Sequence, residues 1–461
     1  MIRLLARGSA ALLFGCLASA TPAAGGNAAL PSRLIVGYWH NFSNGSVLVP
    51  LAEVPAAFDV INVSFAVPTT YLGATITFVP DPALYPDKQS FIDDVTLLKA
   101  LGKKVLISLG GATSAVRLNN ATDVQNFVSS MKTIITDYGF DGMDIDLEGQ
   151  SLALDPGDND FRAPSTAAVV NFINAVKSLL AQFPGGLILS AAPETAFVQG
   201  GAVIYSGVYG CYLPLFHALR DQLTYVHVQH YNTGSMLGRD GAIYQPATAD
   251  FHVAMAEMLL AGFNVNAAGG KIFFPPLPPE KVLIGLPASR DAASSGFTPD
   301  SLLHPALTYL YTGRGFGGAY HLANPGGYIT FRGLMTWSIN WDMYRQQLWS
   351  KSQRPFLDGI VAAVAESPAQ GLPEGQPTLA QNYPNPFNPA TIIRYSVPRT
   401  TTVSLVVFNA LGQTVATLVE GTRKPGVYEV RFDGRSVASG VYFYALRAGE
   451  TTITKRFVLV R

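Results

Sequence analysis

The stretch DGMDIDLE, Asp141 to Glu148, decides how this chain of 461 residues is interpreted. Three carboxylic side chains, Asp144, Asp146 and Glu148, alternate with apolar ones, which is the period of a buried strand. Residues two apart on a strand share a face, so the three carboxyls point the same way. Asp141 has the opposite parity and is expected to fix the start of the strand. Carboxyls crowded into an apolar row cannot all be ionised, so we expect at least one to keep a proton near neutral pH and serve as a general acid.

Two other interpretations of this stretch stay open at this point. One is an acidic strand end exposed to solvent, although the apolar residues between the carboxyls favour burial. The other is a calcium-binding EF-hand loop, whose positions 1, 3, 5, 6 and 12 correspond to Asp144, Asp146, Glu148, Gly149 and Asp155. Position 12 is Asp where Glu is usual, and a strand precedes the loop where a helix is required. We therefore expect no metal here.

The composition is that of a well-folded chain without net charge. Hydrophobic residues make up 48% and charged residues 13%, the latter well below the usual quarter. The formal net charge is zero, so there is no electrostatic basis for binding nucleic acid or an anionic membrane. The length predicts two or three domains. We expect no nucleic-acid partner and no cofactor, and we expect a monomer.

The first 25 residues are typical of an export signal. Arg3 and Arg7 precede an apolar run at 10–18, which is followed by small residues and is too short to span a bilayer. The residues before Cys16 also resemble a lipoprotein processing site, which stays an alternative. After removal of residues 1–25, Cys211 is the single remaining cysteine, so no intramolecular disulfide is expected.

Eight short apolar runs recur along the next three hundred residues, with segments of helical periodicity between them. The runs are 33–39, 60–67, 104–111, 140–148, 187–194, 223–232, 281–289 and 333–342. Strands alternating with helices predict an α/β fold, a (β/α)8 or TIM barrel, over residues 26–365. In such a barrel the chemistry lies where the strands end, as Glu148 does. The segment between the last two runs has room for one helix, so we expect no additional α+β subdomain and an open groove.

Beyond the barrel the pattern changes twice. Residues 366–380 are rich in Pro, Gly and Gln and are predicted to form a linker. Residues 381–461 contain short alternating runs separated by Gly-containing turns, which predict a small all-β sandwich of the Ig-like kind.

Residues 33–350 resemble glycoside hydrolase family 18, the chitinase family. DGMDIDLE is similar to that family's DxxDxDxE, and SLGG at Ser108–Gly111 is similar to its SxGG. Further similarities are INVSFA at 61–66, VQHYN at 228–232 and Trp337 in MTWSINWD. They occur in the family's order and on the expected strands.

The resemblance implies a role for each matching residue. Glu148 would be the general acid and base, and Asp146 would orient the acetamido group of the substrate. Asp144 would share a proton with Asp146, and Tyr231 would hydrogen-bond the acetamido carbonyl. The sugar-binding residues would be Gln229, Asn232 and Trp337, and the structural positions of the motifs would be Asp141, Ser108, Gly110 and Gly111.

Aromatic and histidine residues near these motifs raise further possibilities. Trp39 is expected to bind substrate, since its position predicts an active-face loop on which a ring can stack on sugars, and Trp341 and Phe42 share that position. His227 and His230 have opposite parity on their strand, so they are not expected to chelate one metal.

The resemblance predicts a secreted endochitinase that acts on chitin or another polysaccharide containing N-acetylglucosamine. The attacking nucleophile would be the substrate's own acetamido oxygen, which makes this family an exception to the two-carboxylate scheme. One alternative is an endo-β-N-acetylglucosaminidase acting on N-glycans or peptidoglycan. Another is an inactive chitin-binding lectin on the same barrel.

The C-terminal domain has a resemblance of its own. NYPNPFNPATIIRYSVP at 382–398 and GVYFYALRAGE at 440–450 are similar to the sorting domain of type IX secretion. This implies contact with the secretion machinery and a secreted or cell-surface location. A carbohydrate-binding module is the alternative, although no exposed triad of aromatic residues is evident.

Overall fold

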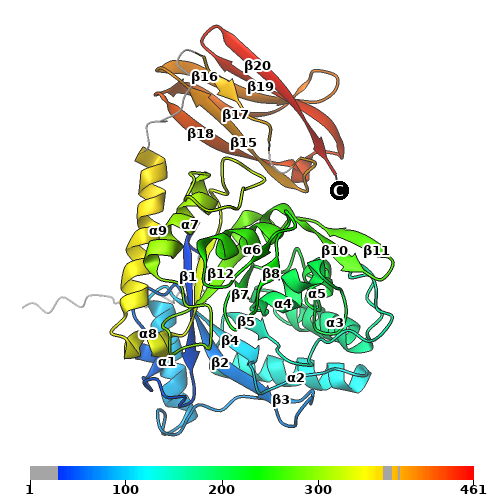
Figure 1. The fold of residues 1–461 in the computed structure, drawn as a ribbon, viewed down its shortest axis with the longest axis vertical. Coiled ribbons are helices and arrows are strands. Elements are labelled where there is room, and N and C mark those ends of the chain that lie inside the picture. The colour runs from blue at the N-terminus through cyan, green and yellow to red at the C-terminus, as the bar shows by residue number, and fades with distance from the viewer. Residues whose placement is uncertain (1–29, 367–375, 383–384, 461) are drawn as a thin grey trace, which may run out of the picture. The chain divides into compact units, whose positions relative to one another are not determined.

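The computed structural model describes residues 30–366, 376–382 and 385–460 (Figure 1). The chain divides between Leu357 and Asp358 into two compact units. The predicted signal peptide at 1–25, including Cys16, and residues 367–375 of the predicted linker lie outside the described residues. No helix in the described part of the chain is long and apolar enough to cross a membrane.

The first unit is built on a closed barrel of eight parallel strands. In spatial order these are β1 (Leu34–His40), β13 (Gly333–Trp337), β12 (Val282–Pro287), β7 (Tyr225–Gln229), β6 (Ile188–Ala191), β5 (Gly142–Asp146), β4 (Lys104–Gly110) and β2 (Val60–Pro68). Pairing of β1 with β2, beginning at Val36 and Val60, closes the circle. The predicted TIM barrel is therefore confirmed, and each of the eight apolar runs overlaps one of its strands.

Helices follow the strands and lie around the barrel (Figure 1). They are α1 (Lys88–Ala100), α2 (Ala121–Tyr138), α3 (Ala167–Ala181), α4 (Thr195–Val198), α5 (Leu213–Ala218), α6 (Ala249–Ala261), α7 (Asp300–Thr312), α8 (Ile339–Tyr344) and α9 (Leu348–Glu366), with short 3-10 turns η1 (Leu51–Glu53), η2 (Gln199–Ala202) and η3 (Pro279–Lys281). The local sequence sets their ends. Asn120 caps α2 by accepting hydrogen bonds from two backbone amides, and Gly139 ends that helix at φ +70°.

Small additions decorate the loops of the barrel. They are β3 (Ile76–Thr77), the pair β8 (Met236–Leu237) and β9 (Ile243–Tyr244), and the hairpin β10 (Phe263–Ala267) and β11 (Gly270–Phe274). Between β12 and β13 the chain forms α7 as its one regular element, so the absence of an α+β subdomain predicted for this segment is confirmed.

The second unit contains two antiparallel sheets. One has the order β17 (Thr414–Arg423), β16 (Thr401–Phe408), β19 (Gly440–Ala448), β20 (Thr451–Leu459), and the other β14 (Thr378–Leu379), β15 (Ala390–Val397), β18 (Gly426–Asp433), with the turn η4 (Gly434–Ser436). Alternate residues from both sheets, such as Ile393 and Tyr444, share one apolar core. The predicted all-β sandwich is confirmed.

Candidate active site

Strand β5 carries the row of carboxyls between β4 and β6. Asp141 lies just before it, where its Oδ2 accepts a hydrogen bond from the Val105 amide at 2.9 Å. Its Oδ1 is 3.3 Å from the Lys99 ammonium and 3.8 Å from that of Lys104. Asp141 thus joins the starts of two neighbouring strands, in agreement with the role expected from its parity.

Asp144 is the innermost carboxyl of the row and is fully buried. Three hydroxyls donate to it, from Tyr38 at 2.5 Å, Ser190 at 2.6 Å and Ser108 at 2.8 Å. The His227 Nε2 lies 3.0 Å from its Oδ1. Burial alone would raise the pKa of Asp144, but the neighbouring His227 imidazole and the hydroxyl donors hold this pKa below its usual value. Asp144 therefore keeps its negative charge inside the barrel.

Asp146 lies two residues further along the chain, toward the C-terminal end of β5. Fewer hydrogen-bond donors contact it than contact Asp144. The Gln229 side-chain amide donates to its Oδ1 at 2.9 Å and lies 3.5 Å from the Glu148 Oε1. The same nitrogen also donates to the Ala192 carbonyl at 2.9 Å, so three acceptors share two protons. Burial, followed by the charges of Glu148 and Asp144, raises the pKa of Asp146 well above its usual value.

Glu148 follows the end of β5 and reaches the pocket. Burial, with a smaller contribution from the charge of Glu194, raises the pKa of the Glu148 carboxyl to about 7. A carboxyl with such a pKa holds a proton at neutral pH and can also release it, as a general acid and base must. The prediction that the row retains protons near neutral pH agrees with the raised pKa values of Asp146 and Glu148.

The two glycines of SLGG allow β4 to approach β5 closely. A Cβ on Gly110 would lie 2.4 Å from the Asp146 carbonyl oxygen, and Gly110 has φ +111°. A Cβ on Gly111, at φ +81°, would lie 2.7 Å from the Phe65 ring. The Gly111 amide donates to the Asp146 carbonyl at 2.7 Å. Both positions therefore require glycine, one for contact with the catalytic strand and one for an aromatic wall.

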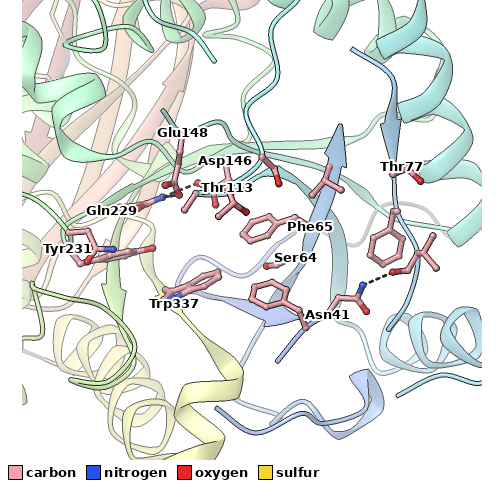
Figure 2. Close-up of a pocket in the computed structure, with 18 residues that line it drawn as sticks. Asn41, Ser64, Phe65, Thr77, Thr113, Asp146, Glu148, Gln229, Tyr231 and Trp337 are labelled. Carbon is pink, nitrogen blue, oxygen red and sulfur yellow. Dashed lines mark hydrogen bonds between the residues drawn. The ribbon is translucent and has the colours of Figure 1, made fainter. Parts of the chain in front are cut away.

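A cavity of about 550 Å³ opens next to these carboxyls. Its lining includes most of the residues that the sequence assigned to the site, namely Asp146, Glu148, Gln229, Tyr231, Asn232 and Trp337. Figure 2 shows Glu148, Asp146, Gln229 and Tyr231 converging on the space next to the Trp337 ring. Phe42, Phe65 and Thr77 also line the cavity, and Figure 2 shows Thr77 of β3 on the side away from Glu148, so the cavity extends from the carboxyls toward β3.

Two aromatic rings form a continuous wall of this cavity. Trp337, which ends β13, lies nearly parallel to Phe65, with ring centroids 5.9 Å apart and planes at 17°. Asn232, at φ +49°, accepts hydrogen bonds from the Ser294 amide and hydroxyl at 2.9 and 2.8 Å. The side chain of Asn232 thus fixes a neighbouring loop while it also lines the cavity.

The prediction that Trp39 binds substrate is wrong. Trp39 is fully buried, its indole nitrogen donates to the Val49 carbonyl at 3.0 Å, and its ring packs against Phe91 of α1. It therefore belongs to the layer between barrel and helices. Trp341 is 8% exposed and does not line the described cavity, whereas Phe42 does.

Neither metal-binding arrangement considered from the sequence is assembled. Asp155, at the last position of the alternative calcium loop, forms an ion pair with Arg117 at 3.0 Å. His227 points into the barrel, where it contacts Asp144. The His230 ring instead pairs with another histidine outside the barrel interior, so the two imidazoles diverge as their parity predicts.

Sequence analysis missed four polar residues around the carboxyls. Tyr38 and Ser190 donate to Asp144, His227 lies within 3.0 Å of it, and Glu194 contributes to the electrostatics of Glu148. Parity could have indicated Ser190, because it pairs directly with Asp144 across the neighbouring strand. The side chain of Tyr38 gave no such signal, because all seven residues of β1 are buried.

Comparison with known proteins assigns the first unit. Residues 34–357 match the model of glycosyl hydrolases family 18. The chain belongs to this family. Residues 381–460 match the model of a secretion system C-terminal sorting domain, in agreement with the resemblance seen in the sequence.

Relatives of the family 18 unit include bacterial and fungal proteins. Chitinase D of Niallia circulans is 52% identical over 330 residues, which cover 71% of this chain and 62% of that protein. The probable class II chitinase of Arthroderma benhamiae is 40% identical and covers 68% of this chain and 96% of its own length. A solved family 18 chitinase from Chromobacterium violaceum has a TM-score of 0.65 and 40% identity, over 73% of this chain and 87% of that one. The chain thus spans less than two thirds of Chitinase D.

Proposed function

We propose that this chain is a secreted endochitinase that cleaves β-1,4-linked N-acetylglucosamine polymers with retention of configuration. The observation that carries the proposal is the carboxyl of Glu148, whose pKa is raised to about 7 at the edge of a cavity with an aromatic wall. The relatives named chitinases support the same substrate class.

Glu148 acts first as acid and then as base. Its proton passes to the glycosidic oxygen as the bond between that oxygen and the anomeric carbon breaks. The resulting carboxylate then takes a proton from water, which attacks the same carbon. The pKa near 7 leaves both forms of Glu148 accessible at neutral pH.

The nucleophile of the first step is the carbonyl oxygen of the substrate's 2-acetamido group. It is already attached to the reacting sugar, so no translational entropy is lost in bringing it to the anomeric carbon. Asp146 accepts the acetamido N–H through its unprotonated oxygen and so orients the group, while the Tyr231 hydroxyl donates to the acetamido oxygen. Asp144 acts through Asp146, because its retained negative charge keeps a proton on Asp146.

The remaining residues hold the sugar that reacts. Trp337 offers its ring face as the floor of the subsite, and Gln229 and Asn232 offer polar groups at its side. Gln229 also bridges Asp146 and Glu148, so it orients both carboxyls. A sugar without an acetamido group supplies no nucleophile, and cellulose and starch are therefore not substrates.

Two alternatives share this barrel. An endo-β-N-acetylglucosaminidase acting on N-glycans or peptidoglycan uses the same machinery, and substrate comparison separates it from a chitinase. A chitin-binding lectin requires an inactive site, whereas this chain carries Glu148, Asp146 and Tyr231 together at one cavity. We therefore favour catalysis.

Hydrolysis of chitin hexasaccharide by the full chain, beside its Glu148→Gln variant, tests the proposal. We expect the wild type to release internal products, and the variant to lose about 10²–10⁴-fold in rate while keeping its fold. No cleavage by the wild type would exclude a chitinase, and full activity of the variant would exclude the role of Glu148. Products that are initially α would exclude attack by the acetamido group, which requires β products.

Export is the second part of the proposal. The sorting domain matched at residues 381–460 directs the chain to the secretion machinery and hence to the medium or the cell surface. Removal of these residues should leave the protein inside the outer membrane, which fractionation would detect. We also propose that the exported protein is a monomer, which light scattering would test.

A further inference from the structure

Glu194 lies at the rim of the barrel among the residues already described. It follows β6, the strand between β5 and β7, and forms an isolated parallel bridge with Gln229. The Gln229 amide donates to the Pro193 carbonyl at 2.9 Å, and its side chain donates to the Ala192 carbonyl. Residue 194 is therefore held between the strand that leads to Glu148 and the strand that carries Gln229.

The half-buried carboxylate of Glu194 has no structural task within the described residues. It precedes α4 but makes no side-chain capping bond, and none of the hydrogen bonds or ion pairs of residues 30–366 uses its oxygens. Glu257, by contrast, is a buried carboxylate with a structural role, because its oxygens have several hydrogen-bonding and ion-pair partners. It accepts from the Tyr320 and Tyr328 hydroxyls at 2.7 Å and lies 3.5 Å from the Arg239 guanidinium.

The charge of Glu194 acts on the residues of the active site. After burial, it is the largest cause that raises the pKa of Glu148, and it also contributes to the raised pKa values of Asp146 and Tyr231. The polar and titratable groups around Glu148 come from β5, from β7, from the segments that follow β6 and β7, and from Tyr212, which precedes α5. The Tyr212 hydroxyl contacts the backbone of Leu147, the residue before Glu148. These groups are Asp144, Asp146, Glu194, Gln229, Tyr231 and Tyr212.

We propose that Glu194 is a positioning residue of the reaction, whose carboxylate keeps the catalytic proton on Glu148 until the glycosidic oxygen accepts it. Glu194 follows a neighbouring strand, and no side chain of the described residues is paired with it, so its negative charge is not cancelled by any described cation. The inference rests on the proposed role of Glu148 as the acid.

The test is the pH dependence of kcat/KM on chitin hexasaccharide for the wild type, Glu194→Gln, Glu194→Asp and the control Glu53→Gln. Glu53 is an exposed carboxylate in η1, outside the site. Removing the charge of Glu194 lowers the pKa of Glu148, so the alkaline limb should move about 0.5–1 pH unit lower. Above that limb the activity relative to wild type then falls about 3- to 10-fold, with little change at pH 5. Glu194→Asp and Glu53→Gln should keep the wild-type limb.

Several outcomes overturn the inference. An unmoved limb in Glu194→Gln contradicts it, and so does a higher KM without any change in the profile, because Glu194 then contacts the substrate instead. If Glu194→Gln does not fold, carboxyl titration of the wild type by ¹³C NMR decides, with Glu148 assigned through Glu148→Gln. The Glu148 carboxyl signal should titrate in two steps, and the second step should also appear in the Glu194 signal. A single step of the Glu148 signal near the usual carboxyl pKa would contradict the inference. A wild type that does not cleave the hexasaccharide instead refutes the proposed function.

Discussion

Replacing Tyr38 by Phe removes a single hydroxyl from the deepest part of the site. That hydroxyl donates to the fully buried Asp144 carboxylate at 2.5 Å. A hydrogen bond to a charged group contributes ~1.5–3 kcal/mol, and leaving a buried charge short of a donor forfeits that amount. Two hydroxyls and His227 still contact Asp144 after the change, so we expect a loss of about 2 kcal/mol in the free energy of unfolding.

The loss should depend on pH in a defined direction. The folded pKa of Asp144 lies below its ordinary value, so its interactions contribute stability that is present above the unfolded pKa and is lost as pH falls through the folded pKa. Removing a donor from Tyr38 raises the folded pKa toward the unfolded value. The difference between wild type and Tyr38→Phe should therefore be complete at pH 7 and shrink below about pH 4.

Tyr311→Phe provides the matched control. Tyr311 is also fully buried, but its hydroxyl has no hydrogen-bond partner in the described structure. Removing that hydroxyl should be neutral or slightly stabilising. Urea unfolding of both variants at pH 7 and at about pH 2.5 measures the contrast. The kcat/KM of Tyr38→Phe should fall about 10-fold or more if Asp144 acts through Asp146. Equal stability of Tyr38→Phe and Tyr311→Phe at pH 7 would refute the reasoning.

Three further outcomes follow from the site. The kcat/KM of the wild type should fall tenfold per pH unit above the pKa of Glu148, about 7, since the protonated form donates; a flat profile to pH 9 would contradict this. Gly110→Ala places a Cβ 2.4 Å from the Asp146 carbonyl oxygen at φ +111° and should lower the free energy of unfolding by about 2 kcal/mol or more. The control Gly102→Ala, at φ +80° with open space around it, should lower it by about 1 kcal/mol. Equal losses would contradict the close approach of β4 to β5. Trp337→Ala should lower kcat/KM on chitin hexasaccharide about 30-fold, as expected for an aromatic anchor of about 2 kcal/mol, and unchanged kinetics would remove Trp337 from the sugar site.

The sequence predicted those parts of the site that repeat along one strand or belong to a motif. The carboxyl row of β5 could be predicted because its side chains alternate with apolar ones. For β1 the sequence did not show which side chains point into the barrel, because every residue of the strand is buried. Residues on one face pack in the barrel interior and residues on the other pack against helices. The two aromatic residues of the strand therefore gave no indication of which faces inward. Tyr38 does so, and Trp39 contacts α1 instead.

Glu194 shows a second limit of sequence analysis. It stands alone after β6, with no periodic partner and no motif around it, so its sequence context is that of an ordinary loop carboxylate. Its proposed role depends on the strand order of the barrel, which places the end of β6 between the ends of β5 and β7. Contacts between neighbouring strands depend on strand order and register, which the spacing of residues along one strand does not reveal.

The chemical differences among the three carboxyls on and just after β5 arise from their neighbours. Asp144 receives hydroxyl and histidine contacts and keeps its charge, whereas Asp146 and Glu148 share the side-chain amide of Gln229. The charge of Glu194 also raises the pKa of Glu148. Negative charge is thus held deep in the barrel, while protons remain toward the cavity. An acid that must later act as a base needs both of its states close in energy at the working pH. The DxDxE spacing alone places three equivalent groups in a row, and their separate roles arise only when β1, β4, β6 and β7 close around them.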